Sequence, residues 1–84
     1  MDTIRLIKRG CGIDVHEKNV VVTIRGEGIK TQTRTFLSFT EDLQELLVWL
    51  KSEGVTHGAM ESTGVYWKPV YNILGDDLNL FPFG

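Results

Sequence analysis

The sequence of 84 residues has a single cysteine, two prolines and no long hydrophobic run. Because a disulfide needs two cysteines, Cys11 cannot form one within the chain, and its apolar neighbours predict the buried, reduced thiol of a cytoplasmic protein. No apolar stretch approaches the ~18 residues of a membrane-spanning helix. The first ten residues carry charges of both signs, among them Asp2 and Arg9, without an apolar core, so we expect neither a signal peptide nor a membrane anchor.

An excess of positive charge is also missing, since 9 Lys and Arg residues stand against 11 Asp and Glu residues and the formal net charge is −2. Domains that bind nucleic acid are usually basic, so charge alone does not favour a DNA-binding function. The composition, 42% hydrophobic and 24% charged, is that of a folded domain. A domain of this size buries only about 60–65% of the surface of its unfolded chain, so we expect a small core.

The first half of the chain has the composition of β-strands. Residues 11–15 are short and apolar, and residues 20–25 are rich in β-branched side chains. The polar residues 16–19 between them have the length of a hairpin connection, and Gly26-Glu27-Gly28 supplies a second turn. Residues 29–39 follow with many hydroxyl side chains, as on an exposed edge strand. The pattern predicts an antiparallel meander of three strands.

The second half changes to helical periodicity. An apolar stripe at spacing i, i+3, i+4 and i+7 is formed by Leu43, Leu46, Leu47 and Leu50. Thr40 or Ser38 is predicted to cap this helix, and Gly54 to end it. Residues 55–60 are predicted to form a buried strand parallel to its neighbour, residues 66–74 a second helix with Pro69 in its first turn, and residues 78–83 a fifth strand. The order βββαβαβ predicts an α/β fold with a mixed sheet.

Two carboxylates lie where apolar strands end. Asp14 is near the end of the first predicted strand, and Glu61 directly follows residues 55–60. If these two strands are neighbours, their backbones lie ~4.8 Å apart and the side chains converge. Carboxylates that close repel each other unless one is protonated or a cation lies between them, and a hard divalent cation such as Mg²⁺ suits oxygen ligands. The alternative is that each carboxylate is solvated at a strand tip or paired with a lysine.

Two segments carry a resemblance to a known family. They are Cys11-Gly12-Ile13-Asp14-Val15-His16 and the longer, more specific Met60-Glu61-Ser62-Thr63-Gly64-Val65-Tyr66-Trp67-Lys68-Pro69-Val70-Tyr71-Asn72. Together they resemble the DEDD-type insertion-sequence transposases (the IS one-ten and IS eleven-eleven group), whose N-terminal domain has an RNase H-like, RuvC-type fold. The resemblance implies four acidic residues that bind Mg²⁺ for DNA strand cleavage and transfer. Asp14 matches the first and Glu61 the second, so both are expected to be catalytic residues and metal ligands.

The resemblance also implies parts that this sequence does not contain. In the family, a closely spaced aspartate pair follows a further strand and a basic loop, and a C-terminal domain carries a nucleophilic serine. Asp76 and Asp77 stand too early and are interpreted as turn residues. We therefore expect residues 1–84 to be a partial N-terminal domain, incomplete at its C-terminus and inactive alone, with the C-terminal domain absent. Pro82 would interrupt a central strand, and the departure from the family pattern indicates a truncation that exposes apolar side chains: Leu78, Leu80, Phe81 and Phe83.

Partners and alternatives follow from the same resemblance. It implies DNA as a partner, a homo-oligomer in the full-length family, and a guide RNA as a further candidate because members resemble RNA-guided recombinases. One alternative is a non-enzymatic fragment that associates with full-length transposase through an exposed sheet edge. Another is an ATP-binding remnant of the actin and sugar-kinase type, which needs glycine and a hydroxyl where this chain has His16, Glu17 and Lys18.

For the remaining side chains of interest, solvation or a structural role is the simpler interpretation. His16 is a candidate contact for metal or phosphate, although a histidine in a turn is more often solvated. His57 is predicted to pack within its strand, and Trp49 and Trp67 in the core. Ser62 and Thr63 are interpreted as turn or helix-capping residues.

Overall fold

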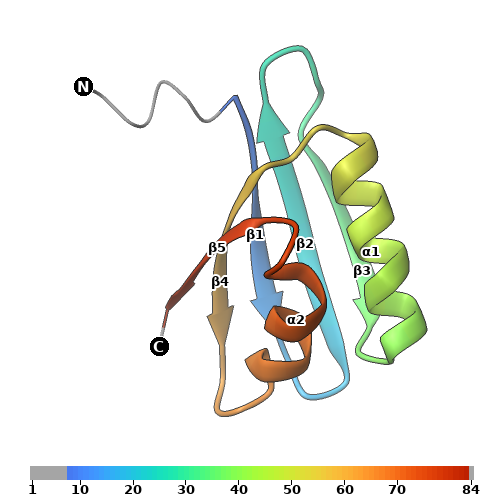
Figure 1. Cartoon of the computed structure of the whole chain (residues 1–84), viewed down its shortest axis with the longest axis vertical. Coiled ribbons are helices and arrows are strands. Elements are labelled where there is room, and N and C mark those ends of the chain that lie inside the picture. The colour runs from blue at the N-terminus through green and yellow to red at the C-terminus, as the bar shows by residue number, and fades with distance from the viewer. Residues whose placement is uncertain (1–7, 84) are drawn as a thin grey trace.

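The computed structural model describes residues 8–83, with side chains up to residue 81. Its elements are β1 (Arg9–Val15), β2 (Asn19–Gly26), β3 (Gln32–Leu37), α1 (Thr40–Ser52), β4 (His57–Ser62), α2 (Trp67–Leu74) and β5 (Asn79–Phe83), as Figure 1 shows. The predicted order βββαβαβ is confirmed. The expectations for the first seven residues and for the Phe83 side chain lie outside the described part.

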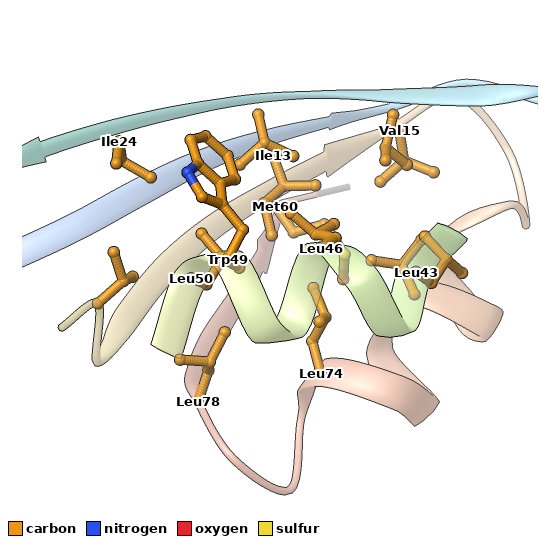
Figure 2. Close-up of a cluster of buried hydrophobic side chains, with 14 residues drawn as sticks. Ile13, Val15, Ile24, Leu43, Leu46, Trp49, Leu50, Met60, Leu74 and Leu78 are labelled. Carbon is orange, nitrogen blue, oxygen red and sulfur yellow. The ribbon is translucent and has the colours of Figure 1, made fainter. Parts of the chain in front are cut away.

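The strands form one sheet of order β3-β2-β1-β4-β5. β1 pairs antiparallel with β2 and parallel with β4, β2 pairs antiparallel with β3, and β4 pairs parallel with β5. The sheet is therefore mixed, as predicted, and β1 lies near its centre. Both helices lie on the same side of the sheet (Figure 2), so the opposite side is not covered by either of them. We call this second side the open face.

The core lies between the sheet and the two helices. Alternate residues of each strand point to opposite faces, so every second side chain of β1, β2 and β4 meets the helices. These strands contribute Ile13, Val15, Val20, Val22, Ile24 and Met60, while α1 contributes Leu43, Leu46, Trp49 and Leu50 and α2 contributes Val70 and Leu74. Each such side chain stabilises the fold by about 1.5–3 kcal/mol on burial. The residues between them in sequence are left on the open face.

The turns confirm most of the predicted boundaries. In the hairpin between β1 and β2, the His16 backbone N–H donates to the Asn19 carbonyl oxygen at 2.9 Å. Gly28 has φ +75° in the turn between β2 and β3, and Gly54 has φ +73° just after α1, as expected for a helix-ending glycine. Within residues 8–83, neither helix has the length and apolar character needed to cross a membrane.

Several predictions about element ends were wrong. β3 spans only Gln32–Leu37, because the residues on either side belong to the turn and to the approach to α1. Phe39 occupies the N-cap position of α1 and no side chain caps it, so neither Thr40 nor Ser38 has the predicted role. β4 runs two residues further than predicted, which places Glu61 within the strand and Ser62 at its end.

The C-terminal elements also differ in part. Pro69 is the third residue of α2, within its first turn as predicted. Of the two roles considered for Ser62 and Thr63, no side chain caps α2, while Thr63 lies in the bend between β4 and α2. Pro82 lies in β5 at an edge of the described sheet, where proline is tolerated, and not in a central strand. Leu78 is buried at 4% exposure and Leu80 is partly buried against the core, both contrary to expectation, whereas Phe81 is 53% exposed as expected.

Candidate metal centre

Asp14 and Glu61 lie side by side on the open face. They are direct partners in the parallel pairing of β1 with β4, which confirms that the two strands are neighbours. Their sequence neighbours Ile13, Val15 and Met60 are buried on the core face, and both carboxylates are exposed. Since paired strands lie ~4.8 Å apart, the two side chains leave the sheet from adjacent positions. The predicted convergence of the two carboxylates is therefore present in the fold.

The carboxylates lie in a shallow hollow of about 360 Å³. Its floor includes Gly12, Thr23 and Ala59, which carry small side chains or none. An added Cβ on Gly12 would have no atom within 4 Å of it. The hollow therefore leaves room beside the carboxylates for a cation and for the group that the cation binds.

His16 contacts one of the two carboxylates. Its Nε2 lies 3.1 Å from Oδ2 of Asp14, and the two side chains are 45% and 57% exposed. The turn hydrogen bond from His16 to Asn19 fixes the backbone from which this ring extends. His16 was expected to be either a contact for metal or phosphate or a solvated residue. His16 lies in the turn directly after β1, so its contact with Asp14 depends on the shape of this turn, and the sequence offered only the nearness of the two residues as a signal.

Asp77 and His57 lie away from this site. Asp77 follows α2 in a turn, as predicted, and its Oδ1 lies 3.4 Å from Nζ of Lys51. The His57 ring stacks on Phe81 with 6.2 Å between ring centroids and lies within hydrogen-bonding distance of the Thr56 hydroxyl, which confirms a packing role. Trp49 is buried, and Trp67 is half-buried against the core.

The donor set fits a hard cation. Within residues 8–83, no three acidic, histidine or cysteine side chains come together closely enough to hold a metal ion. The candidate centre therefore consists of two carboxylates, with His16 attached to Asp14. Carboxylate oxygens are the ligands that Mg²⁺ prefers, and two neighbouring anions gain from a cation between them. Cys11 is unsuited to a role here, because burial raises the pKa of its thiol to about 11.

The strand order and the helix positions define the class of protein. A mixed five-stranded sheet with a parallel β1–β4 pair, in the order βββαβαβ, is an RNase H-like α/β domain, which is the fold predicted. The model of the DEDD-type transposase family of the IS110 group, described as a transposase, matches residues 11–79. The chain belongs to this transposase family, and the matched range includes both Asp14 and Glu61.

Solved structures share the fold at low sequence identity. A Bacteroides thetaiotaomicron protein with an actin-like ATPase fold and unknown function matches with a TM-score of 0.63 and 13% identity, over 90% of this chain and 32% of that one. An Aquifex aeolicus member of the Ppx/GppA family matches with a TM-score of 0.51 and 14% identity, over 90% of this chain and 35% of that one. The chain thus spans about a third of the length of each. No curated protein matches it.

Proposed function

We propose that this chain forms part of the metal-binding site of a DNA transposase, in which Asp14 and Glu61 bind Mg²⁺ where DNA strands are cleaved and transferred. Membership of a transposase family implies that the protein acts on DNA. The observation that carries the proposal is the in-register pairing of Asp14 with Glu61 on the open face. Carboxylate oxygens are preferred ligands of hard divalent cations, and the exposure of this pair leaves it open to approach by DNA.

The two carboxylates and His16 have separate roles in this proposal. Asp14 and Glu61 hold the cation, which when bound neutralises charge at the phosphodiester and activates a water or hydroxyl. In the tautomer with its proton on Nε2, His16 donates a hydrogen bond to Oδ2 of Asp14. This bond would hold the Asp14 carboxylate in one orientation when it binds a cation. Partners that hold a ligand in this way typically control metal affinity by ~10–100-fold.

We also propose that the 84-residue chain does not sustain DNA cleavage alone. Two carboxylates form a weak cage, and within residues 8–83 no third ligand joins them. The resemblance implies two further aspartates in the family's complete site. We expect the purified chain to leave supercoiled plasmid intact in Mg²⁺. Sustained nicking that Asp14→Asn abolishes would contradict this part of the proposal.

The metal site can be tested directly by titrating the chain with Mn²⁺, an analogue of Mg²⁺ that is visible in electron paramagnetic resonance. Asp14→Asn and Glu61→Gln should each abolish saturable binding. The matched control is Asp76→Asn, which makes the same charge change at an exposed turn after α2. If Asp14→Asn binds Mn²⁺ as the control does, the proposed site is wrong. Circular dichroism of each variant checks that the fold is retained.

Two alternatives have their own tests. The likeness to an actin-like ATPase fold concerns the fold alone, and the turn after β1 carries His16, Glu17 and Lys18 where nucleotide phosphates would need glycine. We expect ATP to leave the melting temperature unchanged. Association with full-length transposase is favoured by edge strand β3, because its last residue, Leu37, and the nearby Phe39 are exposed. Co-purification with a full-length relative would support it, and a monomer under the same conditions would argue against it.

A further inference from the structure

A second hollow adjoins the candidate metal centre on the open face. It has a volume of about 440 Å³ and ends at Arg25, and it shares Gly12 and Thr23 with the hollow that holds the carboxylates. The two hollows therefore lie next to each other along β1, with Asp14 and Glu61 at one end and Arg25 at the other. We call the two hollows together the β1 trough.

The trough exists because two positions of β1 have no side chain. Gly10 pairs with Arg25, Gly12 pairs with Thr23, and both glycines alternate with residues that face the core. The fold does not explain the glycine at position 12. Its φ is not positive, and an added Cβ would meet nothing within 4 Å. A glycine inside a strand weakens it and often marks the close approach of a ligand or another backbone.

Arg25 supplies a cation at the far end of the trough. The side chain is exposed, and among residues 8–83 no carboxylate forms an ion pair with it. Arginine binds phosphate through two parallel N–H donors. Arg25 pairs with Gly10, four residues along β1 from Asp14, which corresponds to ~13 Å at ~3.3 Å per residue. This distance is longer than the advance of a single nucleotide, which is ~3.4 Å along the axis of a duplex.

We infer that the β1 trough is a subsite for the DNA backbone, in which Arg25 binds a phosphate a few nucleotides from the phosphodiester at Asp14 and Glu61. Gly12 allows the sugar–phosphate chain to lie against the sheet between these two points. This inference rests on the proposed function and adds to it a positioning contact and a direction for the DNA along β1. Contacts of this kind set the register of DNA and carry no base specificity.

The experiment measures binding of the chain to a fluorescein-labelled DNA duplex by fluorescence anisotropy at several salt concentrations. Arg25→Gln should weaken binding and reduce the magnitude of the slope of log K against log salt by ~0.9, the value for one lost phosphate contact. Arg25→Lys should retain the slope, because it keeps the charge. The control Lys30→Gln removes a positive charge from an exposed residue outside both hollows and should leave the slope unchanged.

A second variant separates occupancy of the trough from loss of charge. Gly12→Val has open space at the Cβ, so it should fold with an unchanged or higher melting temperature and still weaken DNA binding by filling the trough. The inference is overturned if Arg25→Gln and Gly12→Val bind DNA as Lys30→Gln does, or if the wild-type chain binds no DNA. Mn²⁺ titration of the same proteins keeps the two proposals apart. If the wild-type chain binds Mn²⁺ and the trough variants bind DNA as the control does, only the subsite is rejected. If Asp14→Asn does not affect Mn²⁺ binding, the metal centre is rejected.

Discussion

The two faces of the sheet carry different side chains, although the same strands build both. On the core face, β1 and β4 contribute Ile13, Val15 and Met60, each at most 2% exposed, to the contact with the helices. On the open face, the alternate positions hold Asp14, Glu61 and Gly12. Side chains on the core face gain free energy by burial, whereas those on the open face add little to folding. Residues on the open face that stability does not explain are therefore the candidates for function.

The largest expected effect on stability follows from the loss of a core side chain. Leu46 is fully buried between α1 and the sheet, so Leu46→Ala should lower the free energy of unfolding by about 2–5 kcal/mol. Val48 is 67% exposed on the same helix, and Val48→Ala should change it by less than about 0.5 kcal/mol. Urea denaturation of both variants measures the difference. Equal effects would mean that α1 does not pack as described.

An effect of pH on stability, of similar size, is expected from Cys11, which packs against the core. Burial raises the pKa of its thiol from 9.0 to about 11, so the folded state disfavours the thiolate. The contribution of Cys11 to stability is thus fully present below pH 9 and is lost as pH rises towards 11, by at most about 2–3 kcal/mol. Urea denaturation between pH 8 and about 11 should show this loss in the wild type and not in Cys11→Ala.

Substitutions at two glycines, one on each face, test how the two faces differ in their effect on stability. An added Cβ at Gly58 on the core face would lie 2.8 Å from Sγ of Cys11 and 3.0 Å from Cδ2 of Leu80, so Gly58→Ala should destabilise the fold by about 1–3 kcal/mol. Gly12→Ala on the open face should instead stabilise it by about 0.5–1 kcal/mol. Thermal melts of the two variants should therefore shift in opposite directions. A shift in the same direction would show that Gly12 has a structural role after all.

The smallest effect on stability is expected where the effect on function is largest. Asp14 is exposed, so Asp14→Asn should change the free energy of unfolding by no more than about 0.5 kcal/mol. The charge that it removes is nevertheless half of the proposed metal centre. Urea denaturation of this variant with and without Mn²⁺ should give equal midpoints, whereas the wild-type midpoint should rise with Mn²⁺. A large destabilisation without metal would make Asp14 a structural residue.

The fold was predictable because local patterns of the chain determine it. The leucine spacing in α1, the β-branched residues of β2 and the glycine-rich turn predicted the element order, and the crossover through α1 predicted the parallel strand. The pairing of Asp14 with Glu61 followed from that topology. The cap of α1 was mispredicted because a hydroxyl near a helix start is only a candidate cap.

Other features depend on tertiary packing, which local patterns do not encode. The burial of Leu78 depends on how β5 and α2 meet, and the contact of His16 with Asp14 depends on the shape of one hairpin. The continuity of the β1 trough from Arg25 to Asp14 requires the pairing register of β1 with β2 and β4. The pattern of each strand alone gives its faces but not its partners.

The measurement that tests the central claim most directly is to locate a bound Mn²⁺ by its broadening of backbone amide signals in nuclear magnetic resonance spectra of the chain. If Asp14 and Glu61 form a metal centre, the broadening should be strongest at the ends of β1 and β4, around residues 14–16 and 60–62, and Glu61→Gln should remove it. Broadening centred on other carboxylates such as Asp76 and Asp77, or spread over all acidic residues alike, would contradict the account.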